Sequence, residues 1–139
     1  MKKGIIFVLV VAALGAAVYA FRTTVPQSGE EVSLAPFEEL SVQSGSLIAH
    51  PLVVTGKVPG PWFFEASFPV SLLDANGEQL ARVPAQAEGE WMTEGLVPFS
   101  VTIAYTEPAT ETGTLILEKD NPSGLPENAQ EVRIPLRFR

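Results

Sequence analysis

Cysteine is absent from this chain of 139 residues. Its absence excludes a disulfide framework, a thiol nucleophile, a cysteine-ligated zinc site and a lipid-modified cysteine anchor. Histidine is almost as scarce, because His50 is the only one in the sequence. A nucleophilic triad needs a base beside its nucleophile, and metal sites usually need several His or Cys ligands. We therefore predict that the chain is not an enzyme and has no catalytic residue, no metal site and no cofactor. His50 is interpreted as a partly exposed residue at the start of a strand.

Basic residues are also few, nine against 16 acidic ones, which gives a formal net charge of −7. Three of the nine, Lys2, Lys3 and Arg22, flank an apolar N-terminal segment, so residues 23–139 keep six basic and all 16 acidic residues, a net charge of −10. Such a surface repels phosphate backbones and anionic lipid headgroups. We expect no nucleic-acid partner.

One long hydrophobic run is present, at the N-terminus. Gly4 to Phe21 reads GIIFVLVVAALGAAVYAF, 18 residues without charge or proline, which is the lower limit for a helix that crosses a hydrocarbon core about 30 Å thick. Lys2 and Lys3 favour a cytoplasmic N-terminus, so the rest of the chain lies outside the cytoplasm. We predict one transmembrane anchor over residues 1–22, in a single-pass protein of the cell membrane. A signal peptide cleaved after Ala20 is the alternative, and it exports the remaining chain as well.

The next segment, residues 23–46, lacks clear periodicity. Pro26, Gly29, Pro36 and Gly45 interrupt it. This composition predicts a flexible tether between the membrane and a folded domain. Leu40 to Val42, at its end, is a candidate first strand.

From Leu47 onward apolar residues alternate with polar ones, a period of two that is typical of half-buried strands. Turn-rich spacers separate these runs, and Asn76-Gly77 is a strong hairpin signal. Pro69 cannot donate to a ladder, which predicts an edge strand or a bulge at that position. The sequence therefore predicts an all-β fold over residues 47–139, an immunoglobulin-like antiparallel β-sandwich of about seven strands. The expected inner faces are Leu52, Val54, Val58; Phe64, Ala66, Phe68, Val70, Leu72; Val97, Phe99, Val101, Ile103, Tyr105; Leu115, Leu117; and Val132, Ile134, Leu136, Phe138.

Three clusters of oxygen-bearing side chains are the candidates for a calcium site. They are the loop with Glu88, Glu90 and Glu94, the turn from Asp74 to Gly77, and the pair Asp120-Asn121. None has the dense alternation of Asp and Asn that a calcium loop needs. Solubility and turn formation are the preferred interpretations of these residues.

Aromatic residues outside the regular alternation are the candidate partner-binding residues. Trp62 and Phe63 follow a Pro-Gly-Pro elbow, and Trp91 and Met92 form a second pair in another loop. Exposed aromatics on sandwich loops bind proteins or sugars. For Trp62 and Trp91 the preferred interpretation is that they fill the open ends of the sandwich, because large aromatics are mostly buried.

Five segments between Leu47 and Phe138 follow one another in a distinctive order: HPLVVTGKVPG, WFFEASFPVSLLDANGEQLA, GLVPFSVTI, GTLILEKDNPSG and VRIPLRF. In these segments the sequence resembles the immunoglobulin-like domain of bacterial spore germination. This resemblance implies a small, non-catalytic β-sandwich on an exported or membrane-attached bacterial protein.

The expected function is that of a membrane-tethered extracytoplasmic module of the cell envelope that binds a protein or has a structural role. The alternative is a module that binds cell-wall glycan through loop aromatics. In both cases the membrane is contacted through the N-terminal helix.

Overall fold

The computed structural model describes residues 32–139, so the predicted anchor or signal peptide lies outside the described part. The described part is built from strands joined by turns and two short 3₁₀ segments, η1 (Gly60–Trp62) and η2 (Pro126–Asn128). Within it, no helix has the length and hydrophobicity needed to span a membrane. The strands are β1 (Ser46–Leu47), β2 (Leu52–Pro59), β3 (Ser67–Asp74), β4 (Gln79–Ala87), β5 (Leu96–Ile103), β6 (Thr112–Glu118) and β7 (Glu131–Arg137).

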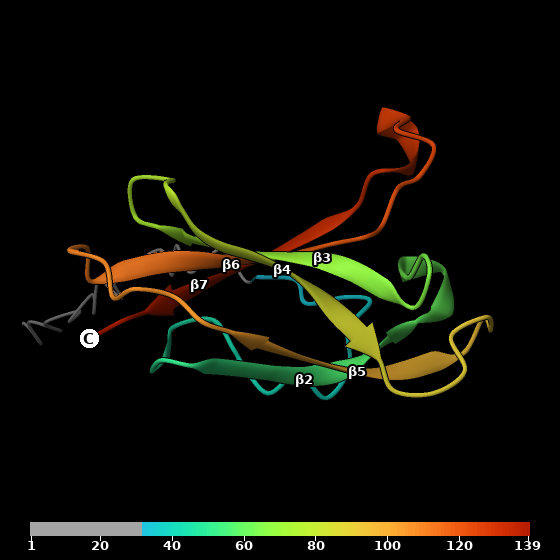
Figure 1. The fold of residues 1–139 in the computed structure, drawn as a ribbon, viewed down its shortest axis with the longest axis horizontal. Helices are drawn as coiled ribbons and strands as arrows, with labels where there is room; N and C mark the ends of the chain where they lie inside the picture. The colour runs from blue at the N-terminus through green and yellow to red at the C-terminus, as the bar shows by residue number, and fades with distance from the viewer. Residues whose placement is uncertain (1–31) are drawn as a thin grey trace, which may run out of the picture. The chain divides into compact units, whose positions relative to one another are not determined.

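The seven strands form one curled sheet in the order β1-β7-β6-β3-β4-β5-β2. All neighbours are antiparallel except β1 and β7, which are parallel. Figure 1 shows β2 and β5 in one layer and β3, β4, β6 and β7 in the other, with the end of β4 descending to β5. The link between the layers is narrow, because only Gln86 and Ala87 of β4 pair with β5. The all-β prediction is confirmed, and the arrangement is consistent with an immunoglobulin-like fold.

Alternating side chains fill the space between the two layers. Every second residue of β5 and β7 is buried, while the residues between them are mostly exposed. Phe68, Val101 and Ile134 come from three different strands and all lie in this core. Each such side chain contributes about 1.5–3 kcal/mol of transfer free energy. In a chain without disulfides, these apolar faces hold the two layers together.

The inward position predicted for Phe64 is wrong. Glu65 and Ala66 have positive φ angles of 50° and 63°, and Phe64 and Ser67 exchange two backbone hydrogen bonds across them, of 2.9 and 3.1 Å. This tight turn ends the alternation before β3 begins. Phe64 is therefore 44% exposed, whereas its neighbour Phe63 is buried at 4%.

Pro69 does not lie on an edge strand, because β3 has β4 on one side and β6 on the other. It lies opposite Pro84 of β4, at a position just before the pairing with β6 starts at Val70. The register shift in this hairpin occurs between Leu72 and Leu73 instead. Proline is tolerated at both positions because the pairing of β3 with β6 begins only after Pro69 and the pairing of β4 with β5 begins only after Pro84.

The predicted hairpin joins β3 to β4. Gly77 has a φ of 80°, which glycine adopts at little cost. The Asp74 carboxylate accepts hydrogen bonds from the backbone N–H groups of Asn76 at 2.8 Å and Glu78 at 2.9 Å. Asp74 is thus occupied in shaping the turn, as the turn interpretation of this cluster expects.

The packed domain begins earlier than residue 47, so the tether boundary drawn at residue 46 needs correction. Phe37 and Val42 are buried in the core. Glu38 and Lys57 exchange backbone hydrogen bonds of 2.8 and 2.9 Å, and the N–H of Ser41 donates to the carbonyl of Thr55 at 2.9 Å. The segment around these residues covers the free edge of β2. Proline and glycine interrupt its periodicity without preventing it from packing.

Candidate functional site

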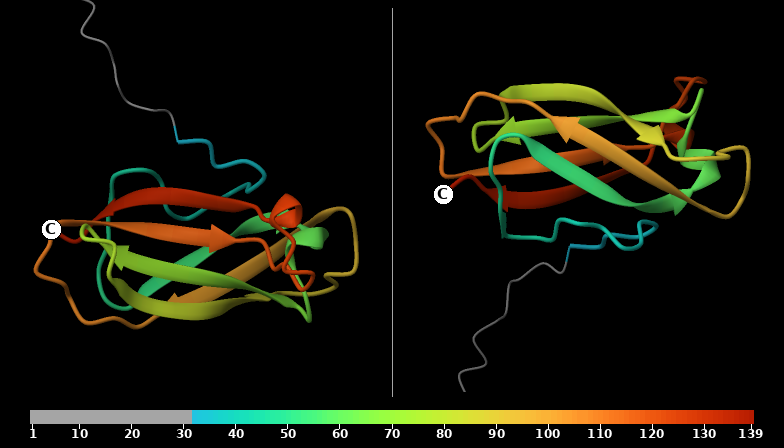
Figure 2. Two further views of the ribbon diagram at one scale, coloured as in Figure 1. Left: turned by 90° about the horizontal axis from the view of Figure 1, so that it is seen from above. Right: turned by 60° about the horizontal axis from the view of Figure 1, so that its bottom comes forward.

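Two loops meet at one end of the sandwich, and we call them the loop end: residues 60–66 after β2 and residues 88–95 before β5. Figure 2 shows both loops at the same end of the molecule. The N–H of Gly60 donates to the carbonyl of Gly95 at 3.1 Å. A Cβ on Gly60 would collide with the carbonyl oxygens of Thr93 and Trp91. Glycine at position 60 therefore lets the two loops come into backbone contact.

A cluster of aromatic rings packs against the loop end on its core side. Trp62 and Phe63 are 3% and 4% exposed. The ring centroid of Trp62 lies 4.8 Å from that of Phe37, and Phe63 lies 5.3 Å from Phe68, both edge to face. Trp62 and Phe63, two of the candidate partner-binding residues, thus lie in the core. The burial of Trp62 agrees with the preferred interpretation that it fills the end of the sandwich, where its ring packs edge to face against other rings.

Trp91 and Met92 lie nearer to solvent. Trp91 is half-buried, and Met92 is 73% exposed. The Glu90 carboxylate accepts a hydrogen bond from the Met92 N–H at 2.9 Å and so fixes the loop locally. A hollow of about 330 Å³ is lined by Gly60, Pro61, Phe63, Trp91, Met92, Thr93 and Glu94. Three of the four predicted residues, Phe63, Trp91 and Met92, therefore border one hollow.

The loop end is acidic. Glu65, Glu88, Glu90 and Glu94 lie in its two loops and are all exposed. Neither loop contains a lysine or an arginine. The loop end thus combines exposed apolar side chains with four negative charges.

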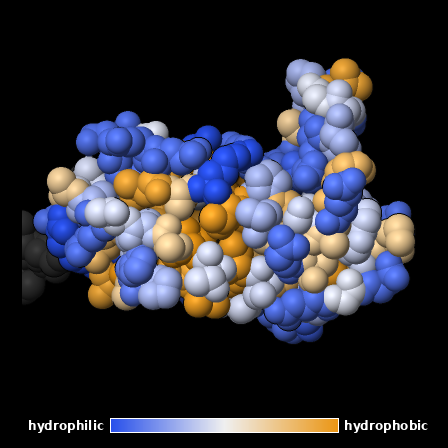
Figure 3. Space-filling model, in the orientation of Figure 1, coloured by the Kyte–Doolittle hydropathy of each residue, from blue (hydrophilic) through white to orange (hydrophobic). Residues whose placement is uncertain are grey.

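A second feature is an arm that extends from the sheet between β6 and β7, residues 119–130. Figures 1 and 3 show it standing off the body of the domain. Side-chain hydrogen bonds fix its shape: Asn121 Nδ2 donates to the Leu125 carbonyl at 2.8 Å, and Ser123 Oγ donates to Asn121 Oδ1 at 2.6 Å. Asn121 is thus used within the turn, and Leu125 is exposed on the arm.

A groove of about 790 Å³ lies between the base of this arm and the outer side of β3 and β4. Arg82 projects into the groove from β4 and donates to Glu118 Oε2 at 2.7 Å and to Ser71 Oγ at 2.8 Å. Lys119 and Asp120 also line it. Because charges of both signs are mixed and partly paired here, the groove favours no one ligand class.

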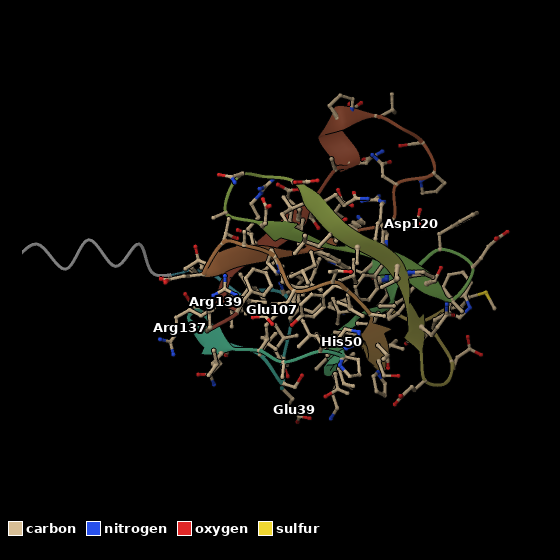
Figure 4. The ribbon with its side chains drawn as sticks, turned by 60° about the vertical axis from the view of Figure 1, so that its left-hand side comes forward. Glu39, His50, Glu107, Asp120, Arg137 and Arg139 are labelled. Carbon is tan, nitrogen blue, oxygen red and sulfur yellow. The ribbon has the colours of Figure 1, made fainter. Side chains whose placement is uncertain are left out.

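The opposite end of the sandwich carries an ion pair and a buried phenol. Figure 4 shows Arg139 beside Glu107, and these residues form an ion pair of 2.9 Å. Burial, with a smaller contribution from Glu107, raises the pKa of Tyr105. Exposed His50 contacts the Tyr105 ring edge to face, with centroids 5.5 Å apart. These contacts are structural, because Tyr105 also packs against the Phe138 ring.

Within residues 32–139 no three His, Cys, Asp or Glu side chains are placed to hold a metal ion. The three loop glutamates Glu88, Glu90 and Glu94 are spread over an exposed loop.

Sequence reasoning missed the exposure of Phe64 and the close approach at Gly60. A Pro-Gly-Pro elbow signals a turn but does not say what the turn touches. The arm carried a visible signal, since KDNPSGLPEN is rich in turn residues, but its position over β3 and β4 depends on the sheet order.

The family comparison matches residues 41–124 to the family model described as the immunoglobulin-like domain of bacterial spore germination. No significant match was found among curated proteins or among solved structures. The matched region runs from the segment that covers β2 to the arm, and β7, which follows it, completes the sheet by pairing along all of β6. The family resemblance seen in the sequence is thereby confirmed, and the chain belongs to the family of immunoglobulin-like domains of bacterial spore germination.

Proposed function

We propose that this chain is a non-catalytic interaction module that an N-terminal helix tethers to the outer side of the cell membrane. The family supports the non-catalytic part, because its immunoglobulin-like domain is a non-enzymatic domain type. The sequence supports the tether through the uncharged run from Gly4 to Phe21 behind Lys2 and Lys3. Tethering raises the effective concentration of a binding module at the surface where its partner lies.

The partner in this proposal is a protein of the cell envelope, and the loop end binds it. The observation that carries this step is the exposure of Met92 on a loop that is held by Gly60 and backed by the buried ring of Phe63. A rigid support lowers the entropy cost of ordering a surface on binding. Of the three aromatic residues expected to bind a glycan, Trp62, Phe63 and Trp91, the first two are buried and only Trp91 remains accessible. A protein partner is therefore preferred to a glycan.

Photocrosslinking in intact cells tests the binding surface. The full chain carries p-benzoylphenylalanine at Met92, and the matched control carries it at Val53, which is exposed on β2 outside the loop end. We expect a discrete crosslinked protein with Met92→p-benzoylphenylalanine that the Val53 variant does not give. Equal products from both positions, or none from either, would contradict the proposed surface.

The absence of cysteine makes the topology simple to test. Ala75→Cys places one thiol on the exposed β3–β4 turn, and Lys3→Cys places one before the apolar run. A membrane-impermeant maleimide should label Ala75→Cys in intact cells and Lys3→Cys only after lysis. Labelling of Lys3→Cys in intact cells, or of Ala75→Cys only after lysis, would refute the proposed orientation.

A further inference from the structure

The charges of the loop end are not used by the domain itself. Within residues 32–139 there are four ion pairs, which join Lys57 to Glu39, Arg82 to Glu118, Arg133 to Glu131 and Arg139 to Glu107. None of them includes Glu65, Glu88, Glu90 or Glu94. Glu90 accepts the Met92 N–H, and that is a contact within its own loop.

Apolar side chains lie among these glutamates. Phe64 and Met92 are exposed in the two loops, and Leu96 is exposed at the first residue of β5. Trp91, which directly precedes Met92, is half-buried. Large exposed apolar side chains that gather on one part of a domain indicate an interaction site. Methionine adapts its flexible side chain to the shape of a partner.

We propose that the loop end docks a basic polypeptide segment that carries a bulky apolar side chain. This inference rests on the proposed function and specifies the chemistry of its partner. The apolar side chain would occupy the hollow beside Phe63, Trp91 and Met92. Flanking lysines or arginines would meet Glu94 at the rim of that hollow and the other loop-end glutamates, since complementary charge steers association and selects partners.

The same charges argue against the other surface that exposed apolar side chains could enter, an anionic lipid bilayer. Peripheral insertion relies on lysine and arginine around the apolar residues, and the loop end has four glutamates and no basic residue. Nucleic acid is disfavoured for the same reason. Charge complementarity thus selects a cationic polypeptide.

Methionine labelling gives a direct test, because the chain contains only two methionines, Met1 and Met92. The full chain, carrying ¹³C-methyl methionine in a zwitterionic detergent, is titrated with the peptide Gly-Lys-Lys-Phe-Lys-Lys-Gly. We expect a saturable shift of the Met92 methyl signal. Two control peptides, one with glutamate for every lysine and one with alanine for phenylalanine, should leave that signal in place. Raising the salt from 50 to 500 mM should weaken binding several-fold, because the ion pairs are exposed to solvent.

Charge variants locate the binding. The triple variant Glu65→Gln, Glu88→Gln and Glu94→Gln should weaken the peptide about tenfold, since each exposed ion pair contributes modestly. The matched control is Glu78→Gln, Glu111→Gln and Glu127→Gln, which removes the same charge from exposed glutamates outside the loop end that belong to none of the four ion pairs and should bind like the parent. Equal loss in both triples, binding of the acidic peptide, or no shift of Met92 at millimolar peptide would overturn the inference.

Crosslinking separates this inference from the proposed function. If Met92→p-benzoylphenylalanine captures a protein whose crosslinked segment is not basic, the function stands and the charge inference falls. If the variant captures no protein at all, the proposed function falls with it.

Discussion

Replacing Gly60 by alanine tests how the loop end is built. The added Cβ would lie 2.5 Å from the Trp91 carbonyl oxygen and closer still to that of Thr93, whereas real contacts of a Cβ stay beyond about 3.0 Å. Both obstacles are backbone atoms, so no side-chain rotation relieves the overlap. The loop of residues 88–95 must move away from η1, and the hydrogen bond from Gly60 to Gly95 must lengthen.

The size of the effect follows from this geometry. Inserting one methyl group into a well-packed site typically costs about 1–3 kcal/mol. Because rigid backbone surrounds Gly60, we expect the upper end, about 3 kcal/mol for Gly60→Ala. Gly95→Ala is the matched control, since it lies in the same contact but its nearest neighbour, Thr93 Oγ1, would be 3.6 Å from the new Cβ. Its expected cost is below about 0.5 kcal/mol beyond the intrinsic preference of the residue.

Denaturant unfolding of the full chain, followed by the fluorescence of Trp62 and Trp91, measures both variants. Since about 1 kcal/mol corresponds to roughly 4 °C in a domain near this size, Gly60→Ala should also lower the melting temperature by roughly 12 °C. If Gly60→Ala unfolds within about 0.5 kcal/mol of Gly95→Ala, then the two loops are not in backbone contact. The account of the loop end given above would then be wrong.

Three further predictions test the core, a turn and a buried phenol. Phe68→Ala should cost about 3–5 kcal/mol in urea unfolding, because its ring is fully buried, while Phe64→Ala should cost less than about 1 kcal/mol; similar costs for the two variants would show that Phe64 is part of the core. Asp74→Ala should cost about 1–2 kcal/mol, since two N–H groups lose their acceptor, and Asp74→Asn should retain most of that stability. The raised pKa of Tyr105 means that the folded state holds its proton more tightly than the unfolded state. The neutral phenol therefore adds to the stability of the fold at pH values below the ordinary tyrosine pKa of about 10, and this contribution is lost as the pH rises through the raised pKa of the folded state. Tyr105→Phe should make the free energy of unfolding fall less steeply with pH between about pH 9 and 12, measured by chemical unfolding. An unchanged dependence on pH would show that other groups cause the fall.

The strands were the most predictable part of the molecule. A strand with one face in the core and one in water imposes a period of two on its sequence. That period marks β5 and β7 clearly, and their inward residues are the ones the sequence predicts. Asn76-Gly77 predicted the hairpin, because the turn needs a residue that adopts a positive φ angle, and Gly77 is that residue.

The candidate site was less predictable, because contacts between distant segments create it. Trp62 and Met92 look alike in the sequence, because both are large apolar residues in segments rich in turn-forming residues. Their burial differs because Phe37, which comes from the supposed tether, packs against Trp62, and the described structure leaves Met92 exposed. Phe64 was misplaced because two residues with positive φ follow it and reset the alternation.

The sequence by itself determined an acidic, cysteine-free, all-β domain with period-two strands and an apolar N-terminal run, since these properties depend on composition and on neighbours along the chain. Only the tertiary structure decided which loop residues are exposed, where the packed domain begins and how the sheet curls. Those features depend on backbone hydrogen bonds and close approaches between segments far apart in sequence, such as Glu38 with Lys57 and Gly60 with Gly95. The alternation within a strand carries no information about these partners.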